Sequence, residues 1–137
     1  MSVVPPHILI AEDEFLIAQA LSASLEGRGF RVTTASNGKK ALEADANDPA
    51  DILVTDLRMP VMDGTELVRR IRQSRPALPV VVMTANADAI QPEDAKRLVI
   101  IQKPFPFDNL VKTLQAVLED RATQGTEQPT SSLLAED

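Results

Sequence analysis

The sequence predicts a single doubly wound α/β domain, a (βα)5 unit with a five-stranded parallel sheet and helices on both faces. Short apolar runs alternate in order with longer segments of helical periodicity. Three of the five short runs are apolar without polar alternation, as in strands that are buried on both faces of a sheet. The length of 137 residues and the hydrophobic content of 44% suffice for one core and exclude disorder over the whole chain.

Five short runs rich in aliphatic and β-branched residues are predicted to be the strands. They are residues 7–11, 30–35, 51–56, 79–84 and 98–102. Right-handed crossovers between parallel strands place helices on both faces of the sheet. The loops at the carboxyl ends of the strands then form a crevice where the strand order reverses, and a functional site is expected there.

Apolar residues at helical spacing predict the helices between and after these strands. Gly27 and Gly29 end the first helix. The pairs Asn37-Gly38 and Asp63-Gly64 open the second and the third. The first helix has its stripe at Ile17, Ala20, Leu21, Ser24 and Leu25, and the second at Ala41, Leu42 and Ala44. The third has Leu67, Val68 and Ile71, and the last has Leu110, Val111, Leu114, Val117 and Leu118.

The fourth helix is predicted to be short. The stretch between Thr84 and Lys103 must hold a loop, a helix and a strand, and Pro92 is best tolerated in a first helical turn. A helix over residues 92–97 would span only about 9 Å.

Beyond about residue 120 the helical periodicity is lost. The expected organisation is therefore an extension over 1–6, one domain over 7–120 and a mobile tail over 121–137, with no second domain.

The composition narrows the possible chemistry. The chain has Lys+Arg 14 against Asp+Glu 20, a formal net charge of −6, no cysteine, and His7 as its single histidine. Thiolate chemistry and sites built on cysteine or paired histidines are therefore excluded, and oxygen ligands remain. Without tryptophan, tyrosine or a broad basic patch, direct nucleic-acid binding is not expected. Because the sequence shows neither a signal peptide nor a long apolar run, a cytoplasmic location without membrane insertion is expected.

Carboxylates follow two of the predicted strands. Glu12, Asp13 and Glu14 come directly after the first strand, Asp56 ends the third, and Asp63 follows a turn further on, so these carboxylates are expected to converge. Like charges brought together oppose folding unless a cation offsets them, and Mg²⁺ prefers oxygen ligands, so a Mg²⁺ site is the economical interpretation. The alternative is that the acids merely favour a helix N-terminus and a turn.

Two further polar side chains are expected in the same crevice. Lys103 ends the fifth strand and Thr84 ends the fourth. An ammonium, a metal and a carboxylate directed at one point make a site that can neutralise an anion, as phosphoryl transfer requires. Taken alone, Lys103 is equally well explained as an ordinary lysine at a strand end, and Thr84 as a β-branched strand residue.

Four motifs at four strand ends resemble the receiver domain of bacterial two-component response regulators. They are Ala-Glu-Asp-Glu at 11–14, Val-Thr-Asp-Leu-Arg-Met-Pro-Val-Met-Asp-Gly at 54–64, Met-Thr-Ala at 83–85 and Lys-Pro-Phe at 103–105. The resemblance covers about residues 7–120. It implies the flavodoxin-like (CheY-like) strand order 2-1-3-4-5.

The resemblance also implies the roles of individual residues. Asp56 would be the phospho-acceptor, phosphorylated by a histidine kinase or a histidine phosphotransfer protein. Mg²⁺ would be held by Glu12, Asp13, Asp56 and the backbone carbonyl of Arg58. Of the remaining residues, Lys103 would pair with the phosphoryl oxygens, Thr84 would hydrogen-bond one of them, Ala85 would leave room for the donor, and the Lys103-Pro104 bond would be cis.

One position departs from the family pattern. The aromatic residue that usually stands three positions before the lysine is replaced by Ile100, which cannot make the same swing when Thr84 moves. The switch is therefore assigned to Thr84 and Ile100 without the usual aromatic coupling. With the short fourth helix, a monomer is expected, and a dimer through the fourth-helix face is not.

The predicted function is a stand-alone receiver that signals by binding an output protein, which the sequence does not identify, or that shuttles phosphoryl groups in a relay. It would support its own phosphorylation and dephosphorylation without being an enzyme. One alternative is a degenerate receiver that is an unphosphorylated interaction module. An aspartyl-phosphate phosphatase is less favoured because Asp56-Leu57-Arg58 lacks the second acid of that class.

Two surface clusters are candidates for partner binding. In the family, the end of the first helix that carries Phe15 and Leu16 helps to bind the kinase or phosphotransferase. Their alternative is peripheral packing. An arginine cluster on and after the third helix is either a docking patch or, more often for such clusters, a solvated face; it consists of Arg69, Arg70, Arg72 and Arg75.

Overall fold

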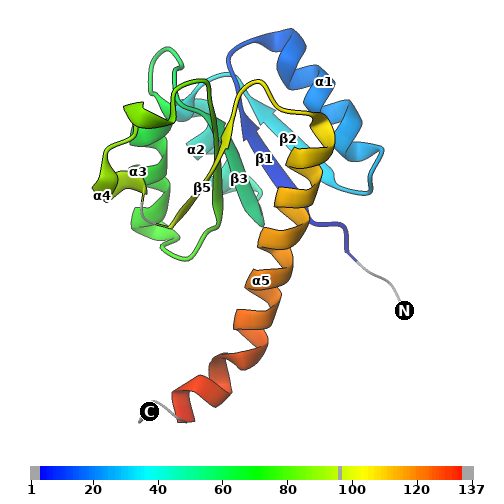
Figure 1. The fold of residues 1–137 in the computed structure, drawn as a ribbon, viewed down its shortest axis with the longest axis vertical. Helices are drawn as coiled ribbons and strands as arrows, with labels where there is room; N and C mark the ends of the chain where they lie inside the picture. Colours follow the sequence, from blue (N-terminus) through cyan, green and yellow to red (C-terminus); the bar gives the residue numbers. More distant parts are fainter. Residues whose placement is uncertain (1–3, 96, 134–137) are drawn as a thin grey trace. The chain divides into compact units, whose positions relative to one another are not determined.

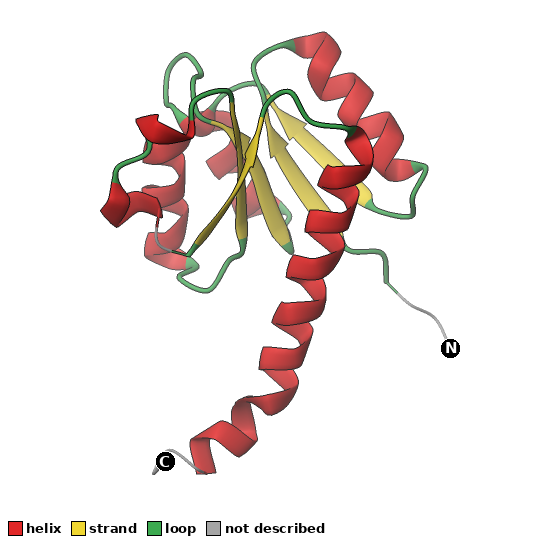
Figure 2. Cartoon of the chain, viewed as in Figure 1, coloured by secondary structure: helices red, strands yellow, loops and turns green. Residues whose placement is uncertain are grey.

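One parallel sheet organises the fold of the computed structural model, which describes residues 4–95 and 97–133 (Figure 1). Its strands are β1 (His7–Ala11), β2 (Arg31–Ala35), β3 (Ile52–Asp56), β4 (Val80–Thr84) and β5 (Leu98–Gln102). Their spatial order is β2-β1-β3-β4-β5, which confirms the predicted topology. Figure 2 shows the strands as yellow arrows. Three predicted strands begin one residue later than expected, and these small differences lie at their amino ends.

The helices are α1 (Phe15–Glu26), α2 (Gly38–Asn47), α3 (Gly64–Ser74), α4 (Pro92–Ala95) and α5 (Phe107–Leu133), with a 3₁₀ turn η1 (Ala87–Ala89) before α4. The short fourth helix is confirmed, because α4 has 4 residues. Asn37 and Asp63 cap α2 and α3 by accepting hydrogen bonds from the backbone N–H groups of Lys40 and Glu66, each at 2.9 Å.

The core has two sides because side chains alternate across each strand. On one side, Leu9, Leu53 and Val82 pack in a cluster with α2 and α3. Ile8 and Ile10 are also fully buried and point to the opposite face, where the right-handed β1–β2 crossover places α1. The central strands are thus covered on both sides, as their unbroken apolar sequences predicted.

The chain divides into two compact units, residues 1–105 with the sheet and α1 to α4, and residues 106–137 with α5. Within the second unit, α5 continues past residue 120, where the sequence indicated the end of regular structure. Residues 134–137 lie outside the described residues. The mobility of the segment 121–137 and the domain limits stay predictions.

Across the described part of the chain, no helix is both long enough and apolar enough to cross a membrane.

A buried ion pair joins α2 to the end of α3. The Nη1 of Arg75 lies 2.6 Å from Oδ1 of Asp45, whose side chain is 6% exposed, and Asp45 also accepts a hydrogen bond from the Ala50 backbone at 2.8 Å. The Nη2 of Arg75 donates to the Ala50 carbonyl at 2.7 Å. The guanidinium therefore connects two elements and the loop before β3.

Replacing Arg75 with alanine is expected to lower the free energy of unfolding by about 2–3 kcal/mol, because it leaves a carboxylate buried without its partner. Urea denaturation measures this loss. Arg70→Ala is the control: it removes an exposed pair with Glu66 at 2.7 Å on the same helix and should change stability by less than about 0.5 kcal/mol. Equal effects of the two substitutions would contradict the assigned role.

Candidate functional site

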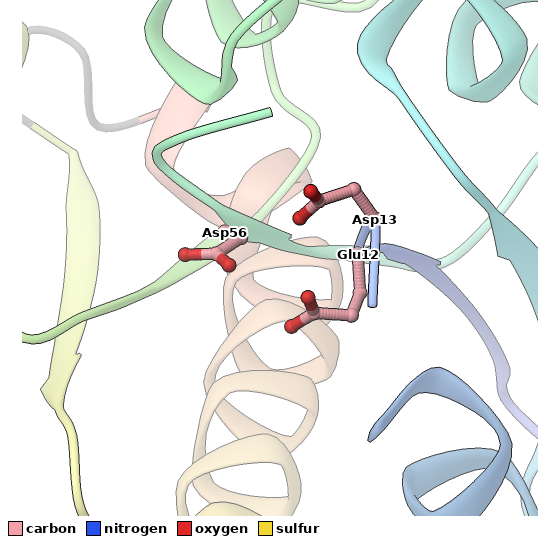
Figure 3. A group of neighbouring side chains, drawn as sticks. All are labelled: Glu12, Asp13 and Asp56. Carbon is pink, nitrogen blue, oxygen red and sulfur yellow. The ribbon is translucent and has the colours of Figure 1, made fainter. Parts of the chain in front are cut away.

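Three carboxylates meet at the carboxyl edge of the sheet. Glu12 and Asp13 follow β1, and Asp56 is the last residue of β3. One carboxylate oxygen from each residue lies within 4.8 Å of the others (Figure 3). Glu12 is buried, Asp56 is half-buried and Asp13 is exposed, so the cluster leads from the interior to the surface.

The topology explains why residues so distant in sequence meet. Strands β1 and β3 are neighbours in register, with Ala11 opposite Thr55, so the residues that follow them emerge at the same level. Strand β1 is also the point where the strand order reverses, and a crevice opens there. The Asp56 carboxylate is oriented by the backbone N–H of Leu57, which donates to its Oδ1 at 2.9 Å.

Lys103 brings a positive charge to this cluster. Its Nζ donates to Oδ2 of Asp56 at 3.2 Å and lies 3.8 Å from Oε1 of Glu12. The Lys103 backbone N–H donates to the Thr84 carbonyl at 2.8 Å, which positions the lysine beside the end of β4. The Lys103-Pro104 peptide bond is cis, as the family resemblance implied.

The buried Glu12 carboxylate is unfavourable in its charged form unless positive charge lies close to it. Burial raises the pKa of the Glu12 carboxyl, and the negative charge of Asp56 raises it further. The backbone N–H of Glu14, which donates to Oε2 at 3.0 Å, lowers this pKa and offsets part of the rise. Among the described residues, the Glu12 Oε1 atom is buried with no hydrogen-bond partner. Three carboxyl groups thus face one ammonium, and a hard cation with oxygen ligands fits this donor set.

Thr84 lies at the same edge but is engaged elsewhere. Its hydroxyl accepts a hydrogen bond from the Asn86 backbone N–H at 3.0 Å and donates to the Asn86 carbonyl at 3.3 Å. In the part of the chain that the structure describes, these are the hydrogen bonds of the hydroxyl, and none joins it to Asp56. The side chain is buried under the turn that it stabilises.

An open cleft of about 460 Å³ joins these groups. It is lined by Asp13, Asp56, Arg58, Thr84, Ala85 and Lys103, together with neighbouring residues. Ala85 and Arg58 are exposed at its edge. The structure therefore brings together the residues that the sequence proposed for one site.

Ile100 stands apart from this cleft. It pairs with Val82 across β4 and β5 and packs, half-buried, against the core cluster. Its part in a switch stays a prediction.

Sequence reasoning missed the importance of Gly64. A Cβ atom there would collide with the backbone carbonyl oxygen of Asp56 and lie 3.1 Å from the Leu57 Cα. The Gly64 N–H donates to the Leu57 carbonyl at 2.8 Å, so α3 begins directly against the end of β3. The Asp-Gly pair signalled a helix start, but not this close approach.

The fold is a doubly wound α/β module with an acidic cluster at the switch point of its sheet, and comparison with known proteins gives the family. The model of the response regulator receiver domain matches residues 8–115, and the chain belongs to this family. It is a response regulator receiver domain of two-component signalling.

One similar curated protein is the DNA-binding transcriptional regulator NtrC of Escherichia coli (strain K12), 35% identical over 114 residues. That match covers 81% of this chain and 24% of NtrC, so the chain spans about a quarter of the length of this relative.

Solved structures show the same fold. The chemotaxis protein CheY4 of Vibrio cholerae is 30% identical with a TM-score of 0.76, and the match covers 83% of this chain and 99% of that one. The response regulator protein TrrA of Thermotoga maritima, solved in complex with Mg(2+)-BeF, is 26% identical with a TM-score of 0.75, over 82% of this chain and 98% of that one.

Proposed function

We propose that Asp56 is the phospho-acceptor of this receiver and that the modified protein signals through protein–protein contacts. The observation that carries the proposal is the geometry of Asp56 in the open cleft, with the Lys103 ammonium 3.2 Å from its carboxylate and two more carboxyl groups beside it. A carboxylate oxygen of Asp56 attacks phosphorus. The bond from phosphorus to the donor breaks, and its electron pair leaves with the donor.

The residues around Asp56 divide the remaining tasks. Glu12, Asp13, Asp56 and the backbone carbonyl of Arg58 would hold Mg²⁺, and the bound ion supplies positive charge that offsets the phosphoryl oxygens. Lys103 stabilises the same oxygens from the other side. Thr84 donates its hydroxyl to one of them once it leaves Asn86, and Ala85 leaves room for the donor. The Mg(2+)-BeF complex of TrrA supports the binding of Mg²⁺ with a phosphoryl mimic, because beryllium fluoride bound to a carboxylate oxygen has the tetrahedral shape of a phosphoryl group.

The proposed phosphoryl donor is a histidine kinase or a histidine phosphotransfer protein. Phe15 and Leu16, at the start of α1 next to the acidic residues, are 69% and 80% exposed. Two large apolar side chains open to solvent beside the acceptor are suited to docking such a partner. The output protein is a further partner, and the chain itself turns over no separate substrate.

Two alternatives predict different behaviour. A degenerate receiver would bind partners without accepting a phosphoryl group, and the complete set of Asp56, Lys103 and Thr84 in one cleft favours the working receiver. A phosphatase would need an acid to protonate the leaving group, and the position two residues after Asp56 is held by Arg58.

Incubation with acetyl phosphate is expected to add one phosphoryl group to the wild-type protein only when Mg²⁺ is present. The reason is that Lys103 alone offsets a single negative charge in a site that already holds three carboxyl groups. Intact-protein mass spectrometry measures the adduct, with a chelator-treated sample as the control. The absence of any adduct, with no binding of Mg²⁺ or beryllofluoride, would replace this proposal by the unphosphorylated interaction module.

A further inference from the structure

The segment between β4 and β5 is tied to α3 by side-chain contacts. Arg69 on α3 donates from Nη2 to Oδ2 of Asp94 on α4 at 2.8 Å and from Nε to Oδ1 at 3.3 Å. The Asp94 side chain is 16% exposed, whereas that of Arg69 is 57% exposed. The paired geometry fixes the position of α4 more closely than a single hydrogen bond would. Figure 1 shows α3 and α4 side by side.

A second arginine of α3 holds the end of the same segment. The Nη2 of Arg72 donates to the carbonyls of Leu78 at 2.9 Å and Arg97 at 2.8 Å. Arg69 and Arg72 are three residues apart on one side of α3, so this helix holds both α4 and the start of β5. Arg69 and Arg72 are thus engaged within the molecule, although the Arg69 side chain is 57% exposed. The use of the arginine cluster as a docking patch stays a prediction.

Helix α4 is short, and of its own side chains Ala95 packs, half-buried, against the core cluster, so ties to α3 matter for the position of this helix. It has 4 residues and no buried residue of its own. A small cavity of about 20 Å³ remains where Val68 of α3, Val82 of β4 and Ile90 approach Asp94. The apolar contacts beneath α4 are therefore incomplete.

At its amino end, the segment between β4 and β5 is held by Thr84, which lines the cleft. The Thr84 hydroxyl holds the Asn86 backbone, and the Asn86 Oδ1 accepts from the Asp88 N–H at 3.1 Å, so the chain from Thr84 to η1 is a connected series of turns. When the hydroxyl leaves Asn86 for a group on Asp56, the Asn86 N–H loses its acceptor. The turn must then rearrange, and α4 is the next element along the chain.

We propose that Arg69 is a positioning residue for phosphoryl binding. Its ion pair with Asp94 holds the segment 85–95 in the arrangement in which Thr84 is turned to Asn86, and so opposes the movement that brings the hydroxyl to the cleft. This inference rests on the proposed function of Asp56. Its consequence is that loss of the ion pair strengthens the binding of a phosphoryl mimic.

Arg69→Ala and Asp94→Asn are each expected to lower the dissociation constant for beryllofluoride, measured with saturating Mg²⁺, by about two- to fivefold. The double variant should gain no more than either single variant, because both remove the same interaction. Arg70→Ala is the matched control, since Arg70 pairs with Glu66 within α3. A merely structural role of Arg69 would leave the affinity unchanged or weaken it, and either result, or additive gains, would overturn the proposal.

Amide hydrogen exchange of residues 86–95 in the Mg²⁺-free protein tests the ion pair without any ligand. Exchange is expected to be faster in Arg69→Ala than in wild type and unchanged in Arg70→Ala. Unchanged exchange in Arg69→Ala would overturn the inference even if beryllofluoride binds. A wild-type protein that binds no beryllofluoride would instead overturn the proposed function, so the two failures are distinguishable.

Discussion

Asp56→Asn is expected to abolish the acetyl phosphate adduct, with a loss of at least about a thousandfold in its rate of formation. The amide is nearly isosteric with the carboxylate but is not a nucleophile, so no phosphorus–oxygen bond forms. The substitution also removes one of three clustered carboxyl groups, so the Mg²⁺-free variant should unfold at the same temperature as wild type or higher. Intact mass and thermal denaturation measure the two effects separately.

Asp63→Asn is the control for this experiment. Asp63 lies on the same loop after β3 and caps α3 through its side chain, a role that asparagine also fills well. It is not one of the three carboxyl groups of the cluster. The Asp63 variant should form the adduct at nearly the wild-type rate. An adduct that still forms on Asp56→Asn would show that another residue accepts the phosphoryl group, which would contradict the proposed function.

Gly64→Ala is expected to destabilise the protein by about 3 kcal/mol and to slow the formation of the adduct. The added methyl group would collide with the Asp56 carbonyl oxygen, which belongs to backbone at the end of a central strand and has no room to move. Relief of the collision must displace either the start of α3 or the Asp56 backbone. The free energy of unfolding and the rate of adduct formation are therefore both expected to decrease in Gly64→Ala.

Gly27→Ala separates this effect from the general cost of replacing glycine. Gly27 ends α1 with φ −65, and its nearest neighbour to a Cβ atom is the Ser24 carbonyl at 3.4 Å. Alanine fits there, so stability should change by less than about 1 kcal/mol. Urea denaturation compares the two variants. A Gly64→Ala protein as stable as Gly27→Ala would show that the β3–α3 junction is looser than the structure indicates.

Much of the fold could be predicted because it depends on local pattern. Unbroken apolar runs identify the buried strands, and their alternation with helical stripes leaves a parallel sheet as the consistent arrangement. The position of Asp56 at the end of one strand and of Glu12 after its neighbour then follows, because parallel strands end at a common edge. The short α4 was also predictable, since the interval between Thr84 and Lys103 leaves little room for a longer helix.

The extension of α5 past residue 120 was not predicted. The segment loses its apolar stripe there and contains Gly125 and Pro129, and periodicity gives no signal for a helix without such a stripe.

Periodicity and chain order suffice to predict the α/β class, the carboxyl ends of the strands, and the meeting of Glu12, Asp56 and Lys103 at one edge of the sheet. The places of Arg58 and Ala85 in the cleft were implied by the family resemblance. The tertiary structure alone decided which atoms those residues contact. Arginine side chains are long and flexible, so nothing in their spacing indicates that Arg69 reaches Asp94 or that Arg75 reaches Asp45. The turn of Thr84 toward Asn86 follows in the same way from what lies within hydrogen-bonding distance once the chain is packed. The same holds for Glu12 Oε1, which accepts no hydrogen bond from any residue that the structure describes.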